Sequence, residues 1–218
     1  MNNKKYRLTE ESIDYCGHML HRIQALRDFG DVKADEFGGF VESEDNLSHE
    51  GNAWVFDQAK VFGNSFVYRD AEVFDNALVY GIARVSDQAS VYDYAQVSGY
   101  AYIGGNAKIH GCAKIYSDVG ICGDADICSD AVITKREDYI IFKNWWSSGR
   151  FFTWTRSNDK WKVGCFYGTD EELVKKAYKD SEVSGREYLR IVNYVREIQG
   201  KSPYYPLIIN KKLNETQH

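Results

Sequence analysis

The sequence predicts a mainly β protein in which a long stack of short strands is followed by a small α+β domain. Three observations carry this prediction. Residues 53–130 divide without a gap into thirteen six-residue repeats, the two prolines both lie after residue 202, and the repeats give way near residue 136 to aromatic strands and helical patterns. An uninterrupted repeat of this length indicates stacked units that contact only their neighbours.

The hexads share one pattern of residue types. The first position is Ala in eleven of the thirteen, the third is always Val or Ile, and the fifth is Asp or Gly in ten. Alternate residues of a strand point to the same side, so the first and third positions face the core and the second and fourth face outward. Asp, Gly and Asn at the last two positions turn the chain. Proline would remove a donor from this ladder, which explains its absence.

These hexads resemble the hexapeptide-repeat proteins, which form a left-handed parallel β-helix, a triangular prism with three hexads per coil. The segment LHRIQALRDFGDVKADEFGGFVESEDNLSHEGNAWV is also similar to the start of a group of these proteins from bacteria and their phages, often named as transferases. The resemblance spans about residues 5–133 and implies about five coils. Because such prisms typically associate as trimers, it also implies a homotrimer.

The regions that flank the hexads are expected to cap the stack. We predict an N-terminal cap over residues 1–40, a β-helix over 41–135 and an α+β domain over 136–218. The cap should turn four apolar side chains inward, namely Ile23, Ala25, Leu26 and Val32.

The C-terminal domain is predicted to contain three strands and two helices. Strands are expected at 139–142, 151–156 and 161–166. Two capping boxes, Thr169 with Glu172 and Ser184 with Glu187, predict the starts of the helices.

Charge and cysteine content exclude several classes of protein. Residues 1–134 hold 21 acidic and 11 basic side chains, and the rest of the chain holds 11 and 16, for a net charge of −5. This acidity disfavours duplex nucleic acid. The basic C-terminal domain suits either docking on the acidic prism or binding an anion. The five cysteines form no CxxC pair, so neither a disulfide scaffold nor a metal site is expected. Without a long apolar run or a signal-like start, we expect a cytoplasmic protein, in the host cytoplasm if it is phage-encoded.

The outward positions are more aromatic than a solvated face should be. One reading is that these ladders are a subunit interface or the seat of the C-terminal domain. The other is a stacking surface for a planar anionic ligand, centred on a column of Phe66, Arg84 and Tyr102 beside the small residues Ser86 and Gly104. Side chains of the other faces would close this groove from a neighbouring subunit. The predicted ligand-binding residues are Arg84, Tyr102, Phe66, Tyr68, Ser86, Tyr92, Lys108, His110 and Lys114.

Three functions remain open. The working hypothesis, suggested by the resemblance to phage proteins, is a non-catalytic trimer that sequesters a small anionic nucleotide-type molecule, a sponge against cyclic-nucleotide immune signalling. The first alternative is a coenzyme A-dependent acyltransferase or an inactive relative of one. Such enzymes commonly use a histidine base and a loop inserted between coils; residues 53–133 hold no insertion, and His110 is the one outward histidine on a regular coil. The second alternative is a structural or protein-docking trimer. No catalytic residue and no cofactor is assigned.

Overall fold

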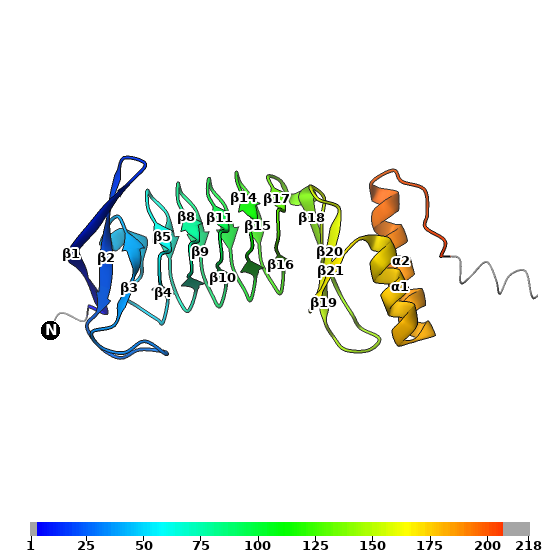
Figure 1. The fold of residues 1–218 in the computed structure, drawn as a ribbon, viewed down its shortest axis with the longest axis horizontal. Helices are drawn as coiled ribbons and strands as arrows, with labels where there is room; N and C mark the ends of the chain where they lie inside the picture. Colours follow the sequence, from blue (N-terminus) through cyan, green and yellow to red (C-terminus); the bar gives the residue numbers. More distant parts are fainter. Residues whose placement is uncertain (1–3, 207–218) are drawn as a thin grey trace, which may run out of the picture. The chain divides into compact units, whose positions relative to one another are not determined.

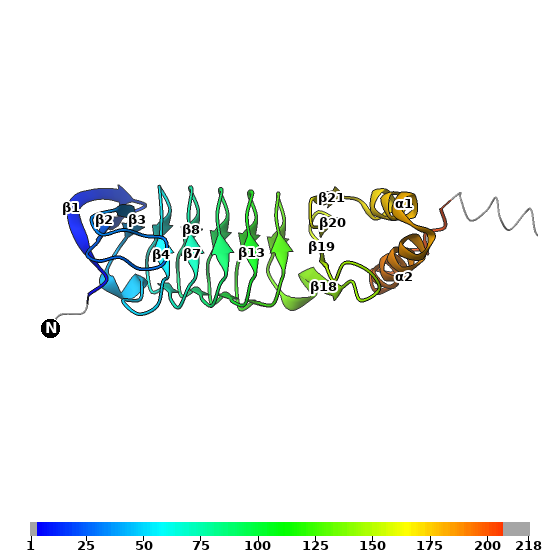
Figure 2. The same ribbon diagram turned by 90° about the horizontal axis from the view of Figure 1, so that it is seen from below.

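The computed structural model describes residues 4–206 and divides the chain into two compact units. The first comprises the residues up to Ile141 together with Thr155–Asn158, and the second comprises Phe142–Trp154 and the chain from Asp159 onward. Successive coils follow one another through the first unit, as Figures 1 and 2 show. Each unit is described separately below.

The hexads of the first unit form a mainly β solenoid of about five coils. Each hexad places its second and third residues in a two-residue strand, and hexads three apart pair in parallel, which makes three ladders: β3–β5–β8–β11–β14–β17, β4–β7–β10–β13–β16 and β6–β9–β12–β15. The strands are β4 (Trp54–Val55), β5 (Lys60–Val61), β6 (Phe66–Val67), β7 (Glu72–Val73), β8 (Leu78–Val79), β9 (Arg84–Val85), β10 (Ser90–Val91), β11 (Gln96–Val97), β12 (Tyr102–Ile103), β13 (Lys108–Ile109), β14 (Lys114–Ile115), β15 (Gly120–Ile121), β16 (Asp126–Ile127) and β17 (Val132–Ile133).

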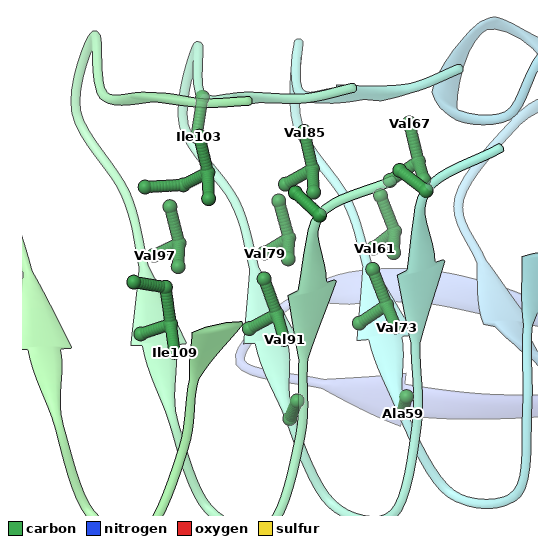
Figure 3. Close-up of a cluster of buried hydrophobic side chains, with 14 of the residues drawn as sticks. Ala59, Val61, Val67, Val73, Val79, Val85, Val91, Val97, Ile103 and Ile109 are labelled. Carbon is green, nitrogen blue, oxygen red and sulfur yellow. The ribbon is translucent and has the colours of Figure 1, made fainter. Parts of the chain in front are cut away.

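The first and third hexad positions fill the interior, as predicted. From Ala53 to Ile133 these Ala, Val and Ile side chains are essentially fully buried. Figure 3 shows them in columns, with Val61, Val79 and Val97 following one another in successive coils. The small Ala and the branched Val or Ile alternate along each side, so three short strands enclose one narrow apolar core.

The corners of the solenoid depend on the fifth hexad position. All thirteen residues there, from Asp57 to Ser129, have positive φ angles between 52° and 73°. Gly, Asp and Asn reach this region at the least cost, which is why the position is so restricted. The carboxylates also link the coils: Asp93 accepts a hydrogen bond from the Gly111 N–H at 2.9 Å.

An antiparallel hairpin begins the first unit. The strands β1 (Tyr6–Tyr15) and β2 (His18–Ala25) pair with each other, and β2 pairs in turn with β3 (Phe37–Val41), which starts the parallel ladder; a short 3-10 helix, η1 (Glu44–Asn46), follows. Three of the four predicted inward residues are buried. The prediction for Leu26 was wrong, because it follows the end of β2 and is 46% exposed.

A buried ammonium group closes the open end of the first coil. In the ladder an N–H donates to the carbonyl 17 residues later, but the Glu36 N–H, which would reach Ala53, bonds to Lys33 O instead. Lys5 Nζ takes its place at 2.7 Å from Ala53 O. Lys5 is fully buried, and this burial lowers its pKa from 10.5 to about 8.

The chain after the solenoid holds a four-stranded sheet and two helices. The sheet order is β18 (Tyr139–Lys143), β19 (Phe151–Thr155), β20 (Lys160–Val163) and β21 (Phe166–Gly168), preceded by the 3-10 helix η2 (Arg136–Asp138). The prediction of one strand over 161–166 was wrong, because a turn at Gly164, with φ +55°, divides it into two strands.

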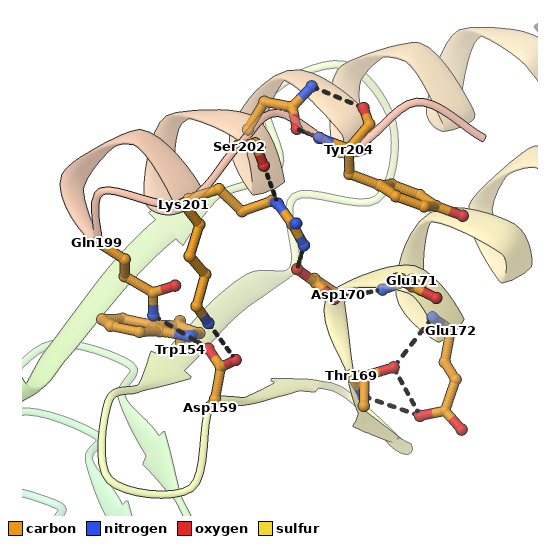
Figure 4. Close-up of polar contacts among 12 residues, drawn as sticks. Trp154, Asp159, Thr169, Asp170, Glu171, Glu172, Gln199, Lys201, Ser202 and Tyr204 are labelled. Carbon is orange, nitrogen blue, oxygen red and sulfur yellow. Dashed lines mark hydrogen bonds and ion pairs between the residues drawn. The ribbon is translucent and has the colours of Figure 1, made fainter.

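The helices are α1 (Asp170–Asp180) and α2 (Glu182–Ile198). Thr169 caps α1 through its capping box with Glu172, as predicted and as drawn in Figure 4. The predicted second capping box was wrong: Ser181, not Ser184, accepts the capping hydrogen bond, so α2 starts three residues earlier. No helix within residues 4–206 is long and apolar enough to cross a membrane.

A glycine pair tests the corner packing. Gly99 and Gly123 share a φ of +69°, but an added Cβ at Gly99 would lie 2.6 Å from Ser117 N, whereas one at Gly123 would meet nothing within 4 Å. Gly99→Ala should therefore lower the free energy of unfolding by about 1–3 kcal/mol more than Gly123→Ala. Denaturant titrations measure the difference, and equal midpoints would show that neighbouring corners do not restrict one another.

Lys5 should give the fold a distinctive pH dependence. Its folded pKa of about 8 lies below the ordinary 10.5, so the cost of burying the charge is fully present below pH 8 and is relieved as pH rises from 8 to 10.5. Across this window the wild type should gain up to about 3 kcal/mol of stability relative to Lys5→Met. Lys4→Met, which removes the neighbouring, partly exposed ammonium, is the control and should keep the wild-type slope. The same slope in Lys5→Met would contradict this account.

Candidate functional site

A groove of about 800 Å³ lies along the β6–β9–β12–β15 face, next to the loop that follows η1. It brings together three of the predicted site residues, Phe66, Tyr68 and Arg84. The other lining residues come from the loop and one corner: Glu44, Asp45, Leu47, Ser48, His49, Glu50 and Asn64.

The floor of the groove is aromatic. The rings of Phe66 and Tyr68 stack with centroids 5.1 Å apart and planes 10° from parallel. They belong to one hexad, at its second and fourth positions, so the strand presents both to the same side. Arg69 lies over the Tyr68 ring, 5.7 Å from its centroid, and pairs with Asp87. A flat floor of this kind suits a planar ligand.

Arg84 supplies the free positive charge of the groove. It is exposed at the start of β9, and its guanidinium makes no hydrogen bond or ion pair within the part of the chain that the structure describes. By contrast, the nearby Arg69 is committed to Asp87. Arg84 is therefore the group that can pair with an incoming anion.

The loop side of the groove carries carboxylates. Glu44 is neutralised by Lys4, whose Nζ lies 2.6 Å from its oxygens, and this hydrogen bond lowers the pKa of Glu44. Asp45 and Glu50 pair with no cation among residues 4–206. They offer acceptors to hydroxyl or amino groups. The groove thus combines one cation, two free carboxylates and an aromatic floor.

Tyr102 and Ser86 form a closed wall rather than an opening. The Tyr102 side chain covers Gly104, where an added Cβ would lie 2.6 Å from the phenol oxygen. The Ser86 hydroxyl donates to that oxygen at 2.9 Å, and Tyr102 donates in turn to Asp87 at 3.3 Å. The space that the small Ser86 and Gly104 leave is filled by this ring.

The remaining predicted residues lie on the other two faces. Phe74, Tyr92 and His110 form a continuous stack, with centroids 4.7 Å apart and planes 3° from parallel at each step. Lys108 is exposed on this same face, and Lys114 is exposed on the third face. Within one chain none of them lines the groove, so its closure by another subunit, and the homotrimer itself, stay predictions.

Sequence reasoning missed the loop residues of the groove. The hexad LSHEGN, residues 47–52, departs from the consensus and was read only as a weak repeat. Its frame contains the signal: Glu50 is 18 residues before Tyr68 and Ser48 is 18 before Phe66. Continuing the outward columns back by one coil places both at the groove.

One curated protein gives a partial match. A protein named "Uncharacterized acetyltransferase YdcK", from Escherichia coli (strain K12), is 38% identical over 63 residues, which cover 25% of this chain and 19% of that protein. No protein-family profile matches the chain. The parallel coils and this match agree with the predicted resemblance. The fold is that of the hexapeptide-repeat left-handed β-helix proteins. Because the chain spans only about a fifth of the relative, activity is a separate question.

Proposed function

We propose that this hexapeptide-repeat β-helix is a non-catalytic binding protein for a small nucleotide-type molecule, held in the groove of the β6–β9–β12–β15 face. The observation that carries the proposal is the meeting of a stacked aromatic pair with an exposed, unpaired guanidinium, Arg84. Aromatic rings bind any base through its π face, and a guanidinium binds phosphate through two parallel hydrogen bonds.

The rest of the groove suits the other parts of a nucleotide. Sugar hydroxyls and exocyclic amines are hydrogen-bond donors, and the carboxylates of Asp45 and Glu50 are acceptors on the opposite side. These carboxylates also oppose a highly charged ligand, since Arg84 is the one cation among the lining residues besides the partly exposed His49. A ligand with one or two phosphate charges, such as a cyclic nucleotide, therefore fits better than a triphosphate.

Sequestration of an immune signal is the biological form of this proposal. A sponge needs affinity and no turnover, so a rigid solenoid with a surface groove is an adequate scaffold. In a phage-encoded trimer each chain would contribute one groove, and Lys108, His110 or Lys114 of a neighbour would complete it.

Ligand binding should raise the melting temperature. At saturation a tight nucleotide stabilises the fold by about 3–4 kcal/mol when present at 100–1,000 times its Kd. We expect a shift with at least one member of a panel of linear and cyclic mono- and dinucleotides, and we expect Arg84→Ala to abolish it. Lys176→Ala removes an exposed cation from α1 and is the matched control. No shift with any nucleotide would end the proposal, and an undiminished shift in Arg84→Ala would remove this groove as its site.

Acyl transfer is the second candidate, favoured by the fold and by the name of the curated relative. Acetyl-coenzyme A contains an adenine nucleotide, so thermal shifts alone would not separate the two functions. Consumption of acetyl-coenzyme A, followed by mass spectrometry with amine and hydroxyl acceptors, does. The binding proposal predicts no turnover above the protein-free rate. Turnover that Arg84→Ala does not reduce would favour a transferase with a site elsewhere.

A further inference from the structure

Three side chains of metal-binding type meet on the β4–β7–β10–β13–β16 face. One ring nitrogen of His110, one carboxylate oxygen of Asp126 and the sulfur of Cys128 all lie within 4.8 Å of one another. We propose that these three residues bind a zinc-class divalent cation and leave one coordination position open. The proposal is independent of the groove, because it uses another face and shares no residue with it.

The coil register brings the three ligands together. His110 and Cys128 occupy the fourth position of hexads in successive coils, 18 residues apart. The strands β13 and β16 pair with Ile109 opposite Ile127, which sets the next residues of the two strands side by side. Asp126 lies two residues before Cys128, so it points to the same side. The donors are thus fixed by a backbone ladder rather than by a mobile loop, as a preorganised metal site requires.

The imidazole is held in the orientation that a metal ligand needs. The Tyr92 ring stacks on His110 from the preceding coil. On one edge Nδ1 faces Asp93 Oδ2 at 3.6 Å, and on the other Nε2 lies 2.8 Å from Asp126 Oδ1. Asp93 is itself fixed by the Gly111 N–H. An outer carboxylate that keeps the proton on one nitrogen and directs the other toward the metal is the usual support of a ligating histidine.

The donor set selects the class of metal. Imidazole nitrogen together with a thiolate favours zinc and similar transition metals over magnesium or calcium, which prefer oxygen ligands alone. Three protein ligands with a fourth position for water are typical of open zinc sites. Cys128 is 8% exposed, while the side chains of His110 and Asp126 are 18% and 28% exposed, so the site is enclosed but accessible.

The local charge also favours a cation. Burial and the negative charges of Asp126 and Asp93 raise the pKa of the Tyr92 phenol to about 12. A bound divalent cation would take the place of the hydrogen between His110 and Asp126. Lys108 is the opposing charge on this face, opposite Asp126 in the ladder, and it is exposed to solvent.

Cobalt provides the test, because it replaces zinc and reports its ligands by absorbance. The untagged full chain is stripped with a chelator and titrated with Co²⁺. We expect one Co²⁺ per chain, visible bands of a tetrahedral site and a near-ultraviolet thiolate band, all displaced by Zn²⁺. Cys128→Ser should lose the thiolate band. Cys122→Ser, at the same position of the preceding hexad but on another face, should keep it.

Two further variants keep the proposal falsifiable if Cys128→Ser does not fold. Asp126→Asn should keep the thiolate band and weaken Co²⁺ binding at least about tenfold, and Asp93→Asn should weaken it about 10–100-fold. The proposal is overturned if Co²⁺ produces no thiolate band, if the band persists in Cys128→Ser, or if both aspartate variants bind as the wild type does.

Discussion

The structure depends on one constraint, the parallel backbone ladder that joins each residue to the coil after it. An N–H donates to the carbonyl 17 residues later along the whole solenoid, as from Phe56 to Val73 and from Tyr92 to Ile109. One residue more or less in any coil would turn every later side chain to the wrong side of its strand. The strict six-residue spacing, the apolar first and third positions and the left-handed backbone of the fifth all serve this register.

The same register decides where chemistry can occur. Outward side chains 18 residues apart lie above one another, so a run of similar residues becomes a column, and a change of residue type becomes a local site. The stack of Phe74, Tyr92 and His110 ends at Cys128, where a thiol replaces a ring. On another face the column from Ser48 and Phe66 reaches a guanidinium at Arg84. Both candidate sites are thus interruptions in an otherwise repetitive surface.

The sequence was sufficient to predict the solenoid but only part of each site. Hexad positions determine which way a side chain points, so the neighbourhood of Phe66, Tyr68 and Arg84 followed from counting. They do not determine rotamers, and the Tyr102 ring fills the space that counting alone left open. The metal-ligand cluster escaped because its donors are 16 and 18 residues apart, a separation that matters only once the coil length is known. Local signals were weakest where alternatives compete, as between Ser181 and Ser184 at the start of α2.

Corner carboxylates connect the stability of the stack to the geometry of its faces. Asp93 accepts the Gly111 N–H and also faces the His110 ring, while Asp87 accepts the Gly105 N–H and also holds Arg69 and Tyr102. These bonds lower the pKa of Asp87, with the Gly105 N–H contributing most, so its charge is retained to lower pH than usual. Each carboxylate that joins two coils also orients a side chain at an outward face. Changes at a corner must therefore alter the sites as well as the fold, and a face can hold its groups rigidly without a loop of its own.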